Sequence, residues 1–269
     1  MSSGEWGSLR LDGHVDRVGG SRVRILVHGE QPVSSTNVAQ RKQPPQNPPP
    51  VQKLRIRYAK RGAARFTSHR DFGRALERAL RRADVPMAYS SGFNPHPRIS
   101  YANAAPTSAA SEAEYVELGL AQRCSPEKVQ EALNSSLPNG FVVLDAADAV
   151  SESLGDLLQA SDWEVSLPDV DPATLEGAVA RFLAEDSHEV ERMTKNGLRT
   201  FDARAAVLHC TTDAQLLTMR LRHTVPLVRP DDVVTALRSL EPALVGQPLL
   251  RRICQGPLAD GEIGDPLRP

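Results

Sequence analysis

The chain has 269 residues, of which 40% are hydrophobic and 24% charged, a composition that fits a globular protein of two modest domains and argues against a fibrous one. No apolar run reaches the roughly 20 residues of a membrane-spanning helix, and no secretory signal is visible, so we expect a cytoplasmic protein with no membrane partner. The three widely separated cysteines exclude a zinc ribbon and suit a reducing compartment. The net charge of −1 excludes a uniformly basic protein.

Residues 1–50 are predicted to be a disordered tail. Gly, Ser, Pro and Gln dominate this segment, and residues 43–50 read QPPQNPPP, which is typical of a polyproline-type spacer. A second interpretation is that the native chain starts near Val51 and that the preceding residues come from a misassigned start.

Residues 51–152 are predicted to form a first, basic domain. Apolar and basic residues alternate from Lys53 to Lys60, which predicts a half-buried strand. Ser68 and Asp71 have the spacing of a helix cap, and apolar residues then recur at helical spacing up to Ala83. Further strands are predicted at 98–104, 114–120 and 141–146, with a helix from 125 to 137.

The same order of elements repeats in residues 153–257. Strands are predicted at 162–167, 189–194, 199–207, 216–222 and 249–254, and helices at 172–184 and 229–240. Asn196-Gly197 predicts a tight hairpin turn. The fold class is therefore α+β, with two tandem ferredoxin-like (βαββαβ) domains behind a disordered N-terminal tail. Residues 258–269 are predicted to be a flexible C-terminal tail.

The positive charge is concentrated in one stretch. Residues 51–105 carry a net charge of +9, which leaves −10 for the rest of the chain. Such a local cationic zone indicates an anionic partner. Guanidinium groups bind phosphates in bidentate fashion, so RNA is the expected partner. The predicted RNA- or phosphate-binding residues are Arg55, Arg57, Arg70, Arg74, Arg78, Arg98, Lys195 and Arg199. The alternative is a solvated helix face with internal ion pairs.

A loop rich in turn residues follows the basic helix. Its motif residues are Tyr89, Gly92, Phe93, Asn94, Pro95, His96 and Pro97. Gly92 permits close backbone approach, the prolines fix the backbone around His96, and the aromatic rings offer faces for unpaired bases. The alternative is a rigid structural loop whose Phe93 fills the core.

Three segments carry a family resemblance. They are RFTSHRD at 65–71, ALERALRR at 75–82 and YSSGFNPHP at 89–97. They resemble the bacterial radical-SAM-associated domain of unknown function, over residues 53–255, although Ser91 stands where many members have Gln. The resemblance implies a radical SAM protein as partner and a context in RNA metabolism. The chain lacks the Cys-x-x-x-Cys-x-x-Cys run of a radical SAM cluster, so it is not itself the radical enzyme.

Two histidines in this region allow a second class of function. His69 and His96 could act as acid and base in an endoribonuclease, because imidazole exchanges protons near neutral pH. A third class is a protein-interaction scaffold whose basic face docks an acidic partner. We predict a non-catalytic protein that binds RNA or presents a substrate to a radical SAM enzyme, with no cofactor and no metal of its own.

Overall fold

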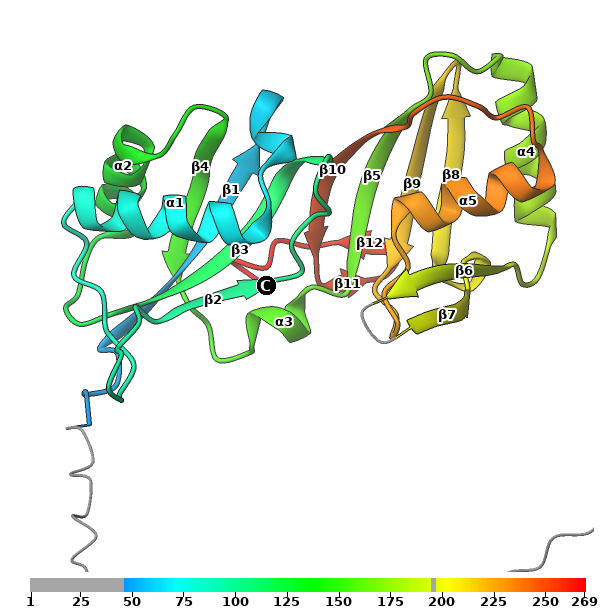
Figure 1. Cartoon of the computed structure of the whole chain (residues 1–269). Coiled ribbons are helices and arrows are strands. Elements are labelled where there is room, and N and C mark those ends of the chain that lie inside the picture. The colour runs from blue at the N-terminus through cyan, green and yellow to red at the C-terminus, as the bar shows by residue number, and fades with distance from the viewer. Residues whose placement is uncertain (1–45, 195–196) are drawn as a thin grey trace, which may run out of the picture. The chain divides into compact units, whose positions relative to one another are not determined.

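A computed structural model describes residues 46–194 and 197–269 (Figure 1). Residues 1–45 of the tail predicted for residues 1–50, and the predicted RNA-binding residue Lys195, lie outside the described residues. The described chain has a mixed α+β fold with five α-helices and one large mixed sheet.

The first half of the chain supplies four strands of the large sheet. Its elements are β1 (Gln52–Lys60), a 3₁₀ turn (Gly62–Phe66), α1 (His69–Arg82), β2 (Ile99–Ala102), β3 (Ala110–Leu120), α2 (Pro126–Ser136), β4 (Phe141–Asp148) and the short α3 (Leu154–Leu157).

The second half supplies the other four strands and a separate hairpin. Its elements are β5 (Ala160–Ser166), α4 (Pro172–Ala184), β6 (Glu189–Thr194), β7 (Gly197–Asp202), a 3₁₀ turn (Arg204–Ala206), β8 (Val207–Asp213), β9 (Leu216–Arg222), α5 (Pro230–Leu240), β10 (Leu249–Gly256), β11 (Leu258–Ala259) and β12 (Glu262–Ile263).

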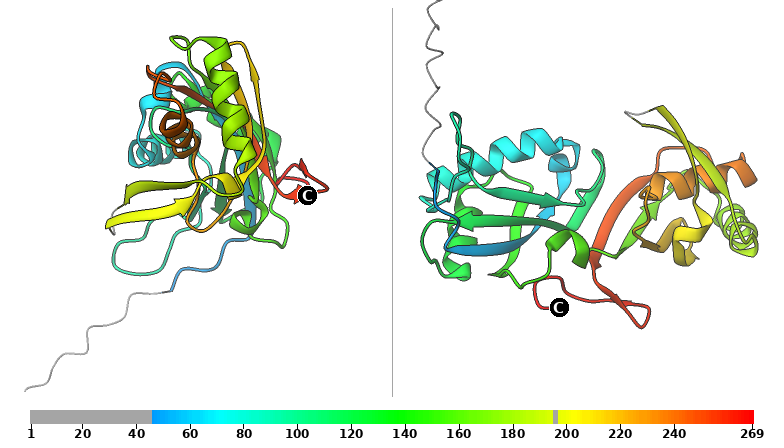
Figure 2. Two further views of the ribbon diagram at one scale, coloured as in Figure 1. Left: turned by 90° about the vertical axis from the view of Figure 1, so that its right-hand side faces the viewer. Right: turned by 90° about the horizontal axis from the view of Figure 1, so that it is seen from below.

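The large sheet runs in the order β4-β1-β3-β10-β5-β9-β8, with β2 paired to β3. Pairing is antiparallel within each half. The halves meet where β10 pairs in parallel with β3 through Arg251↔Ala110 and Arg252↔Ser111. Both α1 and α5 lie on one side of this sheet, and the last residues of the chain lie on the other (Figure 2, left).

The strand predicted at 53–60 and its apolar face are confirmed, but the predicted half-burial is wrong, because Arg55 and Lys60 on the basic face are buried as well. Leu54, Ile56 and Tyr58 are buried in a core shared with the apolar face of α1, where Tyr58 stacks on Phe72 with ring centroids 4.3 Å apart. The cap of α1 is also confirmed, because the Ser68 hydroxyl accepts a hydrogen bond from the Asp71 backbone N–H. The sequence thus sets both the start of α1 and the face that it buries.

The strand predicted at 199–207 is wrong in its extent. β6 and β7 form their own two-stranded sheet, and a new strand, β8, begins at Val207 and enters the large sheet. The break has a local cause. Asp202 Oδ1 accepts hydrogen bonds from the backbone N–H groups of Arg204 and Ala205 and so favours a turn over a continued strand.

Two segments predicted as tails contact the rest of the chain. In residues 46–50, the Asn47 backbone N–H donates to Ser91 Oγ at 2.9 Å. At the other end of the chain, Leu267 is 2% exposed in a small core with Tyr115 and Leu158. Arg268 forms an ion pair with Asp145. Among the described helices none has the length and hydropathy of a membrane span.

Candidate functional site

The outer face of α1 carries exposed arginines. Arg70, Arg74 and Arg78 are all exposed and recur every four residues, slightly more than one turn apart. Arg74 has a distant ion-pair partner, Asp71 at 3.8 Å. No hydrogen bond or ion pair with another described residue holds Arg70 or Arg78. Their charge is therefore available to a ligand.

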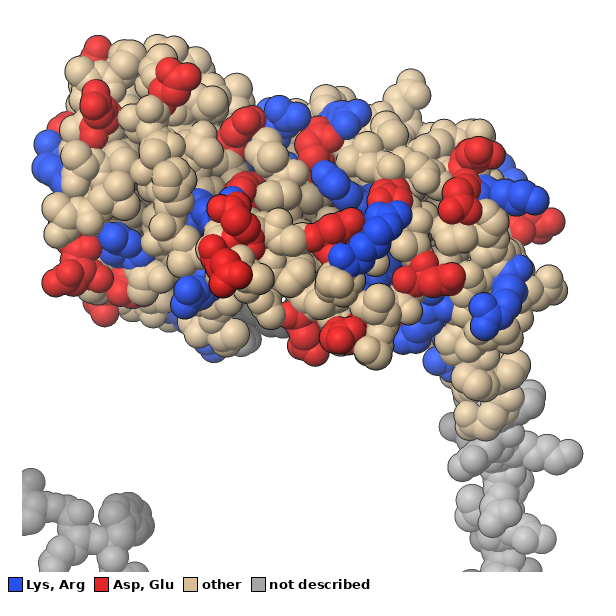
Figure 3. Space-filling view, turned by 180° about the vertical axis from the view of Figure 1, so that it is seen from behind, with Lys and Arg blue, Asp and Glu red and all other residues tan. Residues whose placement is uncertain are grey.

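The basic residues of β1 are placed differently. Arg55 is 1% exposed, and its Nε donates to Glu117 at 3.2 Å. Arg57 Nε donates to the Glu112 carbonyl oxygen at 2.9 Å, and Lys53 pairs with Glu117 at 2.9 Å. These residues alternate along β1 with Leu54, Ile56 and Tyr58, which pack against α1, so they lie on the opposite side of the strand. Seen from behind, the molecule carries interspersed cations and anions (Figure 3). The structure therefore does not join the charge of β1 to that of α1.

The neck of the 89–97 loop is held by backbone hydrogen bonds. The Ser90 N–H donates to the His96 carbonyl oxygen at 2.8 Å, and the His96 N–H donates to Ser90 Oγ at 3.0 Å. Arg98 Nε donates to the Tyr89 carbonyl oxygen at 3.2 Å, and Asn47 Nδ2 donates to the Ser90 carbonyl oxygen at 2.8 Å. The segment before β1 thus clamps a loop that follows α1.

The tip of this loop points into solvent. Phe93 is 74% exposed and Tyr89 is 41% exposed, so Phe93 does not fill the core. Gly92 has φ +124°, a conformation that side-chain-bearing residues rarely adopt, and it sets the direction in which Phe93 leaves the loop. Asn94, Pro95 and His96 are exposed as well. The loop presents an aromatic ring on a braced backbone.

His69 and His96 have different surroundings. The His69 ring packs edge-on against Tyr101, with centroids 4.6 Å apart, whereas the contacts of His96 are those within the loop. Burial raises the pKa of Tyr101 to about 12, so its hydroxyl stays protonated. Within the described chain no hydrogen bond connects the two imidazoles.

The remaining predicted residues lie apart from α1. Arg98 is exposed at the base of the loop, and Arg199 is exposed on β7, opposite Arg192. Arg192 itself pairs with Asp232 and lies over the Phe201 ring at 4.7 Å. The hairpin therefore belongs to the second half, and only Arg199 of its predicted pair lies in the described part of the chain.

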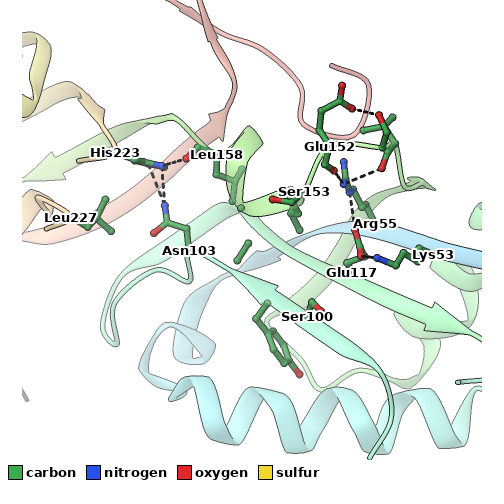
Figure 4. A pocket seen from close by; sticks show the side chains of 16 residues that line it. Lys53, Arg55, Ser100, Asn103, Glu117, Glu152, Ser153, Leu158, His223 and Leu227 are labelled. Carbon is green, nitrogen blue, oxygen red and sulfur yellow. Dashed lines mark hydrogen bonds and ion pairs between the residues drawn. The ribbon is translucent and has the colours of Figure 1, made fainter. Parts of the chain in front are cut away.

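A cavity that the sequence did not indicate lies where the two halves meet. Its volume is about 610 Å³, and it is lined by β1, β2, the segment around α3, and the chain after β9 (Figure 4). Arg55 and Lys53 lie at one end, and Asn103 and His223 lie at the other. A smaller cavity of about 190 Å³ shares Asn103, His223 and Leu227 with it.

His223 is held in one tautomer. Its Nδ1 lies 2.6 Å from the Leu158 carbonyl oxygen, which can only accept, so Nδ1 carries the proton. Its Nε2 lies 3.0 Å from Ser161 Oγ, which itself accepts from Trp163 Nε1 at 2.8 Å. The pKa of His223 is lowered to about 4, chiefly by burial; the hydrogen bond to the Leu158 carbonyl opposes this shift and the Arg252 charge adds to it. The imidazole is neutral at physiological pH.

A buried ion pair lies beside this histidine. Arg252 and Glu114 are 2% and 3% exposed, and Arg252 Nη1 donates to Glu114 Oε1 at 3.1 Å and to the Asn103 carbonyl oxygen at 2.8 Å. The Arg252 guanidinium also lies over the Trp163 ring at 4.7 Å. These residues were missed because they come from distant segments. The one signal of them in the sequence was the presence of polar residues at inward-facing positions of β10.

The described residues contain no group of three or more His, Cys, Asp or Glu side chains that could hold a metal ion.

Comparison with known proteins gives a family and little else. Residues 53–230 match the family described as uncharacterized protein conserved in bacteria (DUF2344). No curated protein matches the chain. A crystal structure of an unknown protein from Galdieria sulphuraria is 16% identical and aligns over 75% of this chain and 98% of that one, with a TM-score of 0.23. At that score the likeness supports no argument about fold or function.

Proposed function

We propose that this chain, which belongs to the DUF2344 family of uncharacterized proteins conserved in bacteria, binds single-stranded RNA. The RNA backbone lies along Arg70, Arg74 and Arg78 of α1, and an unpaired base stacks on Phe93 of the 89–97 loop. We call these residues the RNA surface.

The observation that carries this proposal is the exposure of Phe93. A phenyl ring left 74% exposed has not been used for packing, although its burial would contribute roughly 1.5–3 kcal/mol. Base stacking on an aromatic ring contributes about 1–3 kcal/mol per base, and the exposed arginines of α1 supply the charge that the RNA backbone requires.

The cellular role follows from the resemblance. The 89–97 loop and the helix motif resemble the radical-SAM-associated domain, and the three separated cysteines cannot hold a radical SAM cluster. We therefore propose that the protein presents RNA to a separate radical SAM enzyme in the cytoplasm. We also interpret each half as a ferredoxin-like unit, which the antiparallel orders β4-β1-β3-β2 and β10-β5-β9-β8 support.

Charge reversal on α1 tests the RNA surface. The Arg74→Glu/Arg78→Glu variant should lose at least about tenfold in affinity for a fluorescein-labelled single-stranded RNA in an anisotropy titration, because two phosphate contacts become repulsive. The slope of log affinity against log salt should fall from roughly −2 to roughly −0.7.

The matched control reverses two exposed cations elsewhere. The Arg123→Glu/Lys128→Glu variant changes the net charge by the same amount. Arg123 precedes α2, Lys128 lies on it, and both side chains are exposed. It should bind RNA nearly as well as the unmodified protein. Equal losses in the two variants would show a nonspecific charge effect and refute the proposed surface.

The same titration separates the other two classes of function. An endoribonuclease would shorten the RNA, and the shortening would stop in His69→Ala and His96→Ala. A scaffold would bind no RNA at all and would instead retain a protein partner through α1.

A further inference from the structure

We propose that the cavity between the two halves is a binding site for a mononucleotide, with the phosphate at the Lys53 end and the base at the Asn103 end. This site is separate from the RNA surface, since none of the cavity's lining residues belongs to α1 or to the 89–97 loop.

The size and lining of the cavity suit such a ligand. Small-molecule sites typically have volumes of about 300–1,000 Å³ and combine apolar walls with a few convergent polar groups. This cavity has a volume of about 610 Å³, with apolar walls from Leu154, Leu158 and Leu227. The hydroxyl groups of Ser100 and Ser153 lie between its two ends (Figure 4).

The Lys53 end favours an anion. Two cations, Lys53 and Arg55, share the single carboxylate of Glu117 there. Arg55 Nε and Nη2 are hydrogen-bonded, but its buried Nη1 has no partner within the described chain. The Lys53 side chain is 57% exposed and is within reach of a ligand.

The acid beside Arg55 is turned away from this end. Glu152 accepts a hydrogen bond from the Ser151 hydroxyl at 3.0 Å, and in Figure 4 its carboxylate lies beyond the Arg55 guanidinium, away from Lys53 and Ser100. A phosphate contacting Lys53 therefore experiences a surplus of positive charge, and it can accept from the Ser100 hydroxyl.

The Asn103 end offers an acceptor without a donor. Asn103 Nδ2 donates to Gln255 Oε1 at 3.0 Å, whereas its Oδ1 receives no hydrogen bond from any described residue. Asn103 Nδ2 also lies 3.3 Å from Nε2 of the neutral His223, so Gln255 and His223 together position the amide. Every nucleobase has a donor edge that can meet a fixed carbonyl oxygen, through an exocyclic amine or a ring N–H.

Together the two ends define one ligand orientation. The exposed Lys53 and the buried charge of Arg55 beside it favour an anionic group at one end, and Asn103 Oδ1 at the other end can accept a hydrogen bond from a neutral donor. A ribonucleoside monophosphate carries both groups, separated by a sugar whose hydroxyls match the serines between them.

Titration calorimetry with the full chain tests this assignment. The probes are the four ribonucleoside monophosphates, adenosine and inorganic phosphate. At least one monophosphate should bind with a Kd below about 1 mM, and adenosine and phosphate should each bind at least about tenfold more weakly because each engages one end only. If no monophosphate binds at about 5 mM, or if phosphate binds as tightly as the nucleotides, the assignment is wrong.

Two variants locate the binding. Ser100→Trp fills the cavity from an exposed strand position and should abolish nucleotide binding. Thr211→Trp is the control, because Thr211 is exposed on β8 and lines neither cavity. Lys53→Gln should weaken the monophosphate but leave adenosine unchanged. Unchanged affinity in Ser100→Trp would overturn the proposal.

The two proposals fail independently. Arg74→Glu/Arg78→Glu should bind the mononucleotide normally, and Ser100→Trp should bind RNA normally. Loss of nucleotide binding in the α1 variant would contradict a site separate from the RNA surface.

Discussion

At the scale of single residues, His223 shows how burial decides chemistry. Its two nitrogens are satisfied as a neutral ring, by the Leu158 carbonyl oxygen and the Ser161 hydroxyl. A proton added to Nε2 would have to displace the Ser161 hydroxyl hydrogen bond, next to the Arg252 charge. The folded protein therefore resists protonating this imidazole.

This resistance predicts an acid-dependent loss of stability. The pKa of His223 is about 4 in the folded chain against an ordinary 6.5, so the unfolded chain binds the extra proton first as pH falls. The neutral His223 therefore contributes roughly 3 kcal/mol to the free energy of unfolding. This contribution is present above pH 6.5 and is lost progressively down to about pH 4.

Urea denaturation between pH 7 and pH 4 measures this pH-dependent loss of stability. The His223→Gln variant cannot titrate at this position, so its free energy of unfolding should fall less steeply than that of the unmodified protein. Parallel curves for the two proteins would show that His223 does not contribute to the acid sensitivity.

At the scale of elements, short-range patterns predicted most of the fold. The apolar face of β1, the cap at Ser68 and the periodicity of α1 are local signals, and each is confirmed. The burial of the basic face of β1 is not local, because it depends on residues far along the chain that cover Arg55. The start of β8 and the separate β6–β7 hairpin could not be predicted. Asp202 accepts the hydrogen bonds that end β7, but in the sequence it looks like any polar residue within a strand.

The 89–97 loop is the element on which the proposed function depends most. Phe93→Ala should lower RNA affinity by about 1–3 kcal/mol, which is the contribution of one stacked base. The melting temperature should hardly change, since Phe93 is 74% exposed. Anisotropy titration and thermal denaturation of the same samples measure both quantities.

The control for this prediction is another exposed hydrophobic side chain. Val245 is 59% exposed in the loop after α5, and Val245→Ala should leave RNA affinity unchanged. An unaltered affinity in Phe93→Ala would remove the loop from the RNA surface and leave α1 alone.

At the scale of the whole molecule, the contacts between halves were beyond prediction from the sequence. Arg252 and Glu114 are separated by 138 residues, and the cavity residues Lys53 and His223 lie even further apart in the chain. The sequence grouped the basic residues of 51–105 into one cationic zone. The structure divides it, because β1 and α1 direct their cations to opposite sides.

The Arg252–Glu114 pair should be costly to break. Glu114→Gln leaves a buried guanidinium without its counter-charge, and removal of one partner of a buried pair costs about 3–5 kcal/mol. Glu112→Gln is the control on the same strand, since Glu112 pairs with the half-exposed Arg61 and Arg251 and should cost about 0–1 kcal/mol. Urea denaturation of both variants at pH 7 compares them, and equal costs would contradict a special role for the buried pair.

The position of β10 in the sheet has a consequence for synthesis on the ribosome. β10 is the last long strand of the chain, yet it lies between β3 and β5 at the middle of the sheet order. Until residues 249–256 emerge, β5 is an open edge, and Ala110 and Ser111 of β3 lack their partners. Open strand edges pair readily with other chains. The nascent protein is therefore exposed to misassembly until β10 has emerged and paired with β3 and β5.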